Sequence, residues 1–261
     1  MGPLTVRQPL PSEQLPYLDP FVLLHHAPPK DFSGGAGVSW HPHRGFAPVS
    51  FIFKGGIRHR DTEGNDVTVM AGGTQWMHAG SGVLHDETPL AGETEIIQLW
   101  INSPALHKMD RPSYHPLTPD ATPASLSPDR LVTLHVIAGE LGGVKGPIRT
   151  LSPVNAATVD ARQGGAIEIV LPTAHNAFIY LLDGALRFPD GTTASGLHQV
   201  VFAADGEAVR FEALENTRAL LMSGEPIGEP IVSYGPFVMN TEAEIRAAFR
   251  DYRNGEMGVV P

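Results

Sequence analysis

Short apolar runs separated by turns recur along the first half of the chain. Residues 49–53 and 57–61 flank a glycine-containing turn at 54–56, and residues 67–70 follow after a second turn. Runs of this length, rich in β-branched and aromatic residues, are typical of antiparallel strands joined by hairpins. The pattern therefore predicts a β-meander.

Three further stretches extend this picture. Residues 4–6 and 19–24 predict edge strands, and the glycine-rich residues 31–37 predict a flexible loop that shapes the mouth of a cavity. Residues 96–101 are apolar on both faces, as expected of a barrel wall covered by a second layer.

One segment near the end of the chain has helical periodicity. Residues 241–244 form a capping box, and apolar side chains follow at helical spacing, with Gly255 as a C-cap. The apolar positions are Ile245, Ala248, Phe249 and Tyr252. We expect one amphipathic helix that docks on a barrel.

The second half of the chain repeats the first. Residues 51–58 align without gaps with residues 180–187, which predicts one strand-turn-strand unit used twice. Five prolines lie between Pro112 and Pro128, where we place the domain boundary. The predicted domains are residues 1–118 and residues 119–261.

Composition narrows the class of protein. The 28 glycines and 24 prolines are spread along the 261 residues, which favours many short strands and an all-β fold. A net charge of -10 without a basic run argues against direct nucleic-acid binding. The absence of cysteine leaves only nitrogen and oxygen as metal ligands. The sequence contains neither a long apolar run, which would predict a membrane span, nor a basic leader, which would predict export. We therefore expect a cytoplasmic protein.

Two pairs of metal-ligand residues stand out. His41 and His43 form one pair, and His85 and Glu87 form the other. Residues i and i+2 of a strand point to the same face, so two adjacent strands would bring all four side chains together. Three imidazoles and a carboxylate suit a divalent first-row metal and leave open coordination positions for chemistry. The sequence predicts a mononuclear metal site.

The other histidines have simpler interpretations. His25 or His26 lines a cavity or lies at the surface, and His107 and His115 are solvated near the linker. Ungapped alignment of the two halves places Val170 and Pro172 opposite His41 and His43, so the second half lacks the ligands. The remaining histidines, which have no ligand-type partner, are assigned to packing or the surface: His135, His175 and His198.

The chain resembles the pirin family of bicupin proteins. The resemblance covers essentially the whole chain and rests on HPHRGF at 41–46, HRD at 59–61, QWM at 75–77, GVLHDE at 82–87, QLW at 98–100, HNAF at 175–178, GEP at 224–226 and YGPFVMNT at 234–241. It implies two stacked antiparallel β-barrels of the jelly-roll type with a short C-terminal helix. It also implies that the metal is held by His41, His43, His85 and Glu87.

Four residues beside the ligands depart from the usual family pattern. They are Ala47 and Pro48 in place of a Glu-Thr pair, His78 in place of Thr, and Ser81 in place of a basic residue. Residues around ligands orient them and shape access, so these changes bear on metal preference and substrate choice. His78 is either an additional acid or base in the cavity or a loop residue facing water.

The resemblance to quercetin 2,3-dioxygenases implies cleavage of a flavonol by dioxygen. Fe(II) is the expected ion, with Mn, Ni, Cu or Zn as alternatives. Glu87 is the candidate base for the substrate hydroxyl, and the substrate is expected to be a small aromatic molecule. Apolar candidates for the cavity wall, or alternatively for the barrel core, are Phe46, Phe51, Phe53, Trp76 and Met77.

Two other functions stay open. The family resemblance also implies an iron-binding, redox-sensing regulatory protein that acts through a protein partner. A third alternative is another metal-dependent small-molecule enzyme, such as an isomerase, because cupin barrels host many activities.

Overall fold

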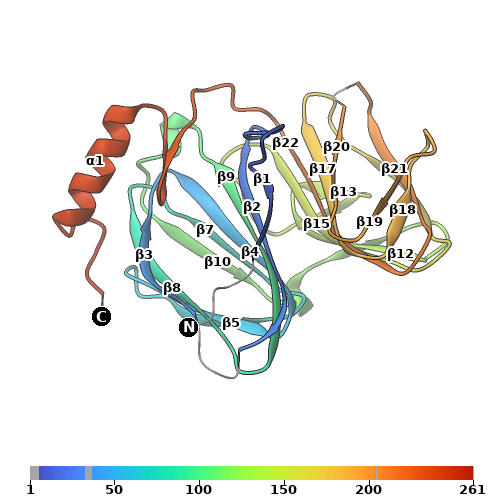
Figure 1. The fold of residues 1–261 in the computed structure, drawn as a ribbon, viewed down its shortest axis with the longest axis horizontal. Helices are drawn as coiled ribbons and strands as arrows, with labels where there is room; N and C mark the ends of the chain where they lie inside the picture. Colours follow the sequence, from blue (N-terminus) through green and yellow to red (C-terminus); the bar gives the residue numbers. More distant parts are fainter. Residues whose placement is uncertain (1–5, 33–36, 204, 261) are drawn as a thin grey trace. The chain divides into compact units, whose positions relative to one another are not determined.

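The computed structural model describes residues 6–32, 37–203 and 205–260 (Figure 1). Its described elements are antiparallel strands, two short 3-10 turns and one α-helix. The chain divides into two compact units, Met1–Pro119 with Ile227–Pro261, and Asp120–Pro226. The all-β bicupin prediction is confirmed.

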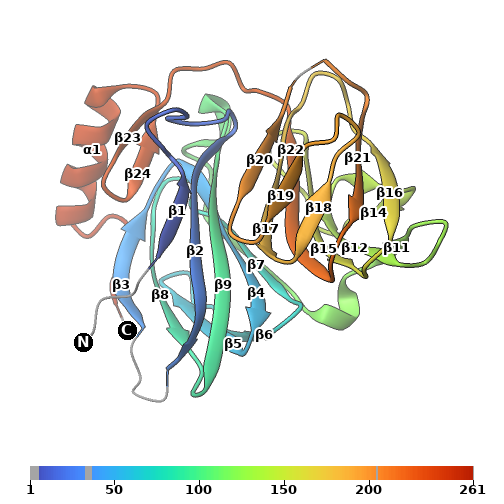
Figure 2. The ribbon, with the colours of Figure 1, turned by 45° about the vertical axis from the view of Figure 1, so that its right-hand side comes forward.

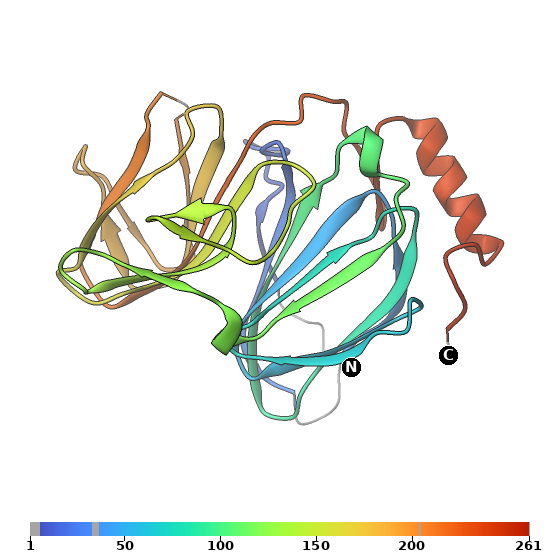
Figure 3. The ribbon, with the colours of Figure 1, turned by 180° about the vertical axis from the view of Figure 1, so that it is seen from behind.

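The first unit contains a six-stranded and a four-stranded antiparallel sheet (Figure 1). The larger sheet has the order β1 (Arg7–Leu10), β2 (Phe21–Asp31), β9 (Glu93–Asn102), β4 (Phe46–Lys54), β7 (Thr74–His78) and β10 (Ser113–Leu117). The smaller sheet has the order β3 (Val38–His43), β8 (Val83–Pro89), β5 (Gly56–Asp61) and β6 (Asp66–Met70). Short 3-10 turns, η1 (Ala105–His107) and η2 (Pro119–Ala121), flank β10 (Figure 3).

The second unit repeats this plan. Its larger sheet has the order β11 (Ala124–Leu126), β12 (Val132–Ala138), β15 (Val154–Ala161), β22 (Thr217–Gly224), β17 (Asn176–Asp183) and β20 (Gln199–Phe202). Its smaller sheet has the order β16 (Ala166–Val170), β21 (Ala208–Ala213), β18 (Ala185–Arg187) and β19 (Thr193–Ser195). A two-stranded ribbon joins β13 (Glu140–Leu141) to β14 (Val144–Lys145).

The sheet orders confirm the predicted repeat. Strands β4 and β5 contain residues 51–58, and β17 and β18 contain the aligned residues 180–187. The smaller sheets have the orders β3-β8-β5-β6 and β16-β21-β18-β19. With β5 matched to β18, strands β3 and β8 of the first unit correspond to β16 and β21 of the second. The two ligand strands of the first unit thus have direct counterparts in the second.

The buried side chains of these two counterpart strands are apolar. Ile169 of β16 and Val209 and Phe211 of β21 are buried in the hydrophobic core of the second unit. An apolar barrel core gains stability from burial but offers no ligand atoms. Among the described residues, both groups of three potential ligand side chains lie in the first unit.

The end of the chain packs with the first unit. The hairpin of β23 (Val232–Tyr234) and β24 (Phe237–Met239) and helix α1 (Glu242–Arg253) follow the second unit in sequence (Figure 2). Their buried residues Phe237, Met239, Ile245 and Ala248 cluster with Leu84 of β8 and with Met257, which follows the helix. The compact units therefore differ from the sequence-based division, which assigned all of residues 119–261 to one domain.

The predicted helix is confirmed in detail. Thr241 accepts a hydrogen bond from the Glu244 backbone N–H, and the Glu244 side chain accepts one from the Thr241 backbone N–H, which completes the capping box. Asn254 is the C-cap, and Gly255 follows it with a φ of 77°. Gly255 therefore supplies the left-handed residue after the cap instead of the cap itself.

Two predicted segments fall partly outside the described residues. The residues that lie outside are 4 and 5 of the predicted first strand and 33–36 of the predicted glycine-rich loop. Of the helices within the described ranges, none is long and apolar enough to cross a membrane.

Candidate metal centre

The four predicted ligands lie on two adjacent strands. His41 and His43 are on β3, His85 and Glu87 are on β8, and His41 pairs directly with His85 in the antiparallel register. The Nε2 atom of His41 lies 3.1 Å from Nε2 of His43 and 3.0 Å from Nε2 of His85. The three imidazoles therefore converge through the same ring nitrogen.

The remaining ring nitrogens determine the tautomers of His41 and His43. Nδ1 of His41 lies 2.9 Å from the Ser39 carbonyl, and Nδ1 of His43 lies 3.1 Å from the Pro236 carbonyl. A carbonyl oxygen can only accept, so each Nδ1 carries the proton and a neutral ring has its lone pair on Nε2. Two such lone pairs facing each other at 3.1 Å are an arrangement that a proton or a metal ion between them would stabilise.

The spacing of the nitrogens also fits a metal ion. Ligand nitrogens that bind at about 2.1 Å and subtend a right angle at the ion are about 3.0 Å apart. Burial, with a smaller effect of neighbouring His41, lowers the pKa of His43 to about 3. Burial and the adjacent histidines also lower the pKa of His85 well below its usual value. Both rings are therefore in the neutral form that a metal requires.

Glu87 is held by two donors. The Ser50 hydroxyl donates to its Oε1 at 2.9 Å, and the Gln98 amide donates to its Oε2 at 2.8 Å. The Trp100 indole N–H donates to the other end of the Gln98 amide at 3.3 Å, which orients that amide. In this arrangement Glu87 groups with His59 and His85, whereas His41 and His43 group with His85 alone.

His59 is a further histidine of the centre. It pairs with Glu87 across β5 and β8, and its Nε2 lies 3.0 Å from Oδ2 of Asp61. The phenol ring of Tyr114 stacks on it at 4.0 Å with an interplanar angle of 6°. The sequence pattern gives no separate role to His59, Ser50 or Gln98. The signal available for His59 was its place in HRD on a strand next to the ligand strand.

A cavity opens beside Glu87. Its volume is about 120 Å³, and Glu87, Gln98 and His25 supply its polar groups. The apolar lining comes from Val6, Ala27, Phe32, Val38, Ile57, Pro89 and Ile96. His25 therefore does line a cavity, and its Nε2 contacts the Gln8 amide oxygen at 2.8 Å.

The apolar residues named as candidates for either the cavity wall or the barrel core do not line this cavity. Phe46, Phe51, Trp76 and Met77 are buried in the barrel, and none of these or Phe53 lines the cavity beside Glu87. Phe46 instead packs against the ring of His43, with centroids 5.0 Å apart. Core and cavity positions have the same apolar character in sequence, so the sequence could not separate them.

The family departures have defined places. His78 ends β7 and is 7% exposed, so it is neither a loop residue facing water nor a residue lining the cavity beside Glu87. Ala47 and Pro48 are buried in β4, and the Ser81 carbonyl accepts a hydrogen bond from Nε of Arg44 at 2.6 Å.

The other histidines have ordinary partners. His26 is buried next to Glu95, and His107 pairs with Asp110. In the second unit, His135 pairs with Asp160 at the surface. Two more hydrogen-bond to nearby groups, His175 to Ser223 and His198 to Ser195.

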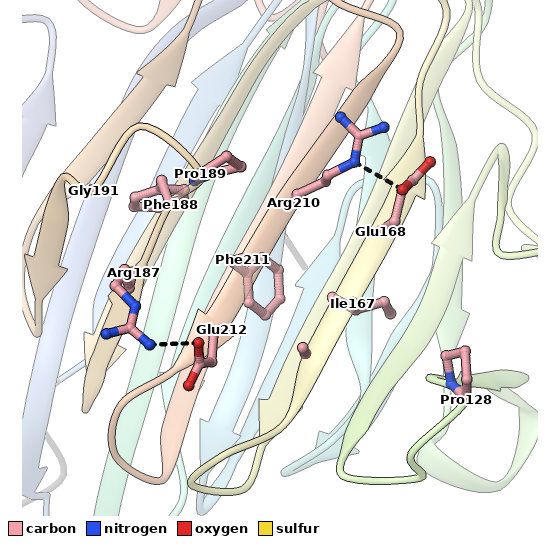
Figure 4. Close-up of a pocket in the computed structure, with 11 residues that line it drawn as sticks. Pro128, Ile167, Glu168, Arg187, Phe188, Pro189, Gly191, Arg210, Phe211 and Glu212 are labelled. Carbon is pink, nitrogen blue, oxygen red and sulfur yellow. Dashed lines mark hydrogen bonds and ion pairs between the residues drawn. The ribbon is translucent and has the colours of Figure 1, made fainter.

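A larger depression lies on the small sheet of the second unit (Figure 4). Its volume is about 520 Å³, and the cross-strand pairs Arg187–Glu212 and Arg210–Glu168 flank buried Phe211. Each charge is neutralised by its neighbour at an exposed position, so this surface resembles an ordinary solvated sheet face.

Comparison with known proteins gives the same assignment for both halves. The family model described as pirin matches residues 4–101, and the model described as the pirin C-terminal cupin domain matches residues 156–258. Pirin-1 of Arabidopsis thaliana is 39% identical over 92% of this chain and 84% of its own length. Pirin of Mus musculus is 35% identical over 97% of this chain and 88% of its own length.

A solved structure is also closely similar. Quercetin 2,3-dioxygenase from Acinetobacter baumannii superposes with a TM-score of 0.89 and 35% identity, covering 94% of this chain and 88% of that one. The paired barrels and the cluster of histidines in the first unit define a bicupin with a candidate metal centre. With both family models and these relatives in agreement, the chain belongs to the pirin family.

Proposed function

We propose that this protein is a metal-dependent dioxygenase of the quercetin 2,3-dioxygenase type, with His41, His43, His85 and Glu87 as ligands. The proposal is carried by the convergence of three imidazoles through Nε2, one of which, His85, lies close to the Glu87 carboxylate that borders the cavity. It is supported by the 35% identity to the Acinetobacter baumannii enzyme. Fe(II) is the expected ion, and the same donor set accepts Mn, Ni, Cu or Zn.

The protein side chains have separate roles in this reaction. A bound divalent ion would acidify a coordinated hydroxyl and bring the substrate and dioxygen together. His41, His43 and His85 would hold the ion. The carboxylate of Glu87 would take the proton of the flavonol hydroxyl, since it borders the cavity and both of its oxygens accept hydrogen bonds.

The residues around Glu87 would keep it aligned. Ser50 and Gln98 donate one hydrogen bond to each carboxylate oxygen. Hydrogen bonds to an ionised carboxylate are stronger than those between neutral groups, so they fix the direction of its lone pairs. The apolar cavity walls would bind an aromatic ring and exclude water.

The cavity volume favours a second candidate function. About 120 Å³ is less than the roughly 300–1,000 Å³ of cavities that enclose drug-sized ligands. Only part of a three-ring flavonol fits inside it. An iron-binding, redox-sensing protein that acts through a protein partner needs no large cavity, and this is the alternative.

Aerobic turnover of a flavonol tests the proposal. The protein is reconstituted in turn with Fe(II), Mn(II), Ni(II), Cu(II) and Zn(II), and loss of flavonol absorbance is followed. We expect turnover with at least one ion, abolished in Glu87→Ala and retained in His135→Ala, whose histidine lies in the second unit. Stoichiometric metal binding without turnover would reject the dioxygenase in favour of the regulatory alternative.

A further inference from the structure

The orientation of one proposed ligand depends on the far end of the chain. The carbonyl that receives Nδ1–H of His43 belongs to Pro236, 193 residues later in sequence. Pro236 lies in the turn between β23 and β24, in the part of the chain that returns to the first unit (Figure 2). A partner on the second ring nitrogen fixes the tautomer and the angle of a ligand imidazole.

A buried lysine joins the two sides of this contact. Nζ of Lys108 donates to the Gly45 carbonyl at 2.6 Å, to Oδ1 of Asn102 at 2.6 Å and to the Val238 carbonyl at 3.0 Å. Gly45 follows His43 by two residues, and Val238 follows Pro236 by two residues. One ammonium group therefore ties together the two segments that meet at His43.

Lys108 is suited to this position. Its side chain is 1% exposed, and an ammonium has three N–H donors for the three acceptors present. Burial lowers the pKa of Lys108 to about 8, and the carboxylates of Glu229 and Glu244 oppose this shift. At neutral pH the group is therefore protonated and can make all three bonds.

Backbone contacts bring the same two segments close together. The Val238 N–H donates to the Arg44 carbonyl at 3.1 Å, and Arg44 forms an isolated parallel bridge with Phe237. A Cβ atom at Gly45 would lie 2.1 Å from the Val238 carbonyl oxygen. Only glycine permits this approach.

Helix α1 contributes a second tie. Nη1 of Arg44 donates to Oδ2 of Asp251 at 2.7 Å, and the Arg44 side chain is 5% exposed. Arg44 directly follows His43, so the ion pair holds the residue next to the ligand. Removing one partner of a largely buried ion pair leaves the other charge unpaired and disturbs its surroundings.

We infer that Lys108 is a positioning residue of the metal centre. Together with the Arg44–Asp251 ion pair, Lys108 holds the Pro236 carbonyl against His43. This inference rests on the proposed metal ligands and does not depend on dioxygenase activity. The second half of the sequence thus contributes to a centre whose ligands all lie in the first half.

Cobalt(II) affinity tests the inference. The intact protein and its variants are titrated with Co(II) in competition with a chelator, and the visible spectrum of the bound ion is recorded. We expect Lys108→Met to bind Co(II) about 10- to 100-fold more weakly than the unaltered protein and to change its spectrum. Asp251→Asn is expected to weaken binding by a smaller factor. Arg246→Ala, at an exposed ion pair on the same helix, is the matched control and should bind normally.

A second measurement uses the metal-free protein. The ¹⁵N chemical shifts of His43 report its tautomer, which we expect to be fixed with the proton on Nδ1 in the unaltered protein and mixed in Lys108→Met. Unchanged affinity together with an unchanged tautomer in Lys108→Met would overturn the inference. If that variant does not fold, the same two measurements on Asp251→Asn decide.

The outcomes separate the inference from the proposed function. Lack of Co(II) binding by the unaltered protein would reject the metal centre itself, and the His43 tautomer would then decide the positioning role independently. Normal binding by the unaltered protein and by Lys108→Met, together with an unchanged His43 tautomer in that variant, would reject only the role of Lys108.

Discussion

Nε2 of His41 lies 3.1 Å from Nε2 of His43, although each ring directs Nδ1 toward a backbone carbonyl. When each ring carries a single proton, on Nδ1, the two Nε2 lone pairs repel each other unless a cation lies between them. A bound ion relieves this repulsion only in the folded protein, because the unfolded chain does not hold the two rings together. Metal binding should therefore stabilise the fold.

Removal of metal is expected to lower the melting temperature. Free metal at 100 times its dissociation constant adds about 2.7 kcal/mol to the free energy of unfolding. Differential scanning calorimetry with and without a chelator measures the shift. The His43→Ala variant, which lacks one of the facing lone pairs, should show a much smaller response, and an equal response would argue against this site.

Substitution of the proposed ligands should remove the metal. We expect His41→Ala and Glu87→Ala to lose most of their metal content by elemental analysis, because each change deletes one of the four proposed donor atoms. His135→Ala, an exposed histidine paired with Asp160, serves as the control. Full metal content in both ligand variants would show that the assignment is wrong.

The Ser50 hydroxyl should matter for turnover more than for metal content. Ser50→Ala removes the donor to Oε1 of Glu87 and leaves the Gln98 donor to Oε2 in place. The carboxylate can then rotate, and misalignment of a general base reduces the rate by about 10- to 100-fold. Flavonol turnover and elemental analysis on one preparation measure both effects. Unchanged turnover would show that Ser50 is not needed to align Glu87 for the reaction.

Substitution of Gly45 by alanine should destabilise the protein more than the same substitution at a glycine in open space. The φ of Gly45 is +86°, and a Cβ there would meet the Val238 carbonyl oxygen and the Met239 sulfur. Gly64 also has a positive φ, +93°, but a Cβ added there would have no atom within 4 Å. We expect Gly64→Ala to reduce the free energy of unfolding by about 1–2 kcal/mol and Gly45→Ala by about 3–5 kcal/mol. Urea denaturation compares them, and equal losses would contradict the close approach.

Tyr114 should make the protein sensitive to alkaline pH. Burial, with smaller effects of Glu87 and Asp61, raises the pKa of Tyr114 above its usual value. Above a pH of about 10 the unfolded chain therefore loses a proton that the folded protein keeps. The folded state binds more protons in that range, so the free energy of unfolding falls as pH rises.

Comparison with Tyr114→Phe isolates this effect. The Tyr114 hydroxyl has no hydrogen-bond partner among the described residues, so the variant should differ by less than about 1 kcal/mol at pH 7. Urea denaturation at pH 7 and pH 10.5 should show a smaller alkaline loss in the variant. Parallel losses in the two proteins would mean that Tyr114 ionises normally in the fold.

The sequence was sufficient to predict that the two pairs of candidate ligands lie close together. The two-residue period of a strand places His41 beside His43 and His85 beside Glu87, and the structure pairs β3 with β8. The repeated strand-turn-strand unit likewise predicted the second barrel and its loss of ligands. These features follow from local periodicity, which a single sequence records well.

The surroundings of the site were not predictable in the same way. Ser50 and Gln98 look like ordinary polar residues of strands, and their contact with Glu87 depends on how two sheets face each other. The contact of Pro236 with His43 joins residues 193 positions apart through a backbone carbonyl, which has no sequence signature. For the same reason the proline-rich linker suggested a simple division into halves, whereas residues 227–261 return to the first unit.

The return of the chain has a consequence for its synthesis. A ribosome adds roughly 5–20 residues per second, so about 10–40 s separate His43 from Pro236. Throughout that interval the nascent chain has His41 and His43 but lacks the carbonyl that orients the second of them. The order of translation thus delays completion of the proposed metal centre until the protein is almost finished, and a prematurely terminated chain would have His43 without its orienting partner.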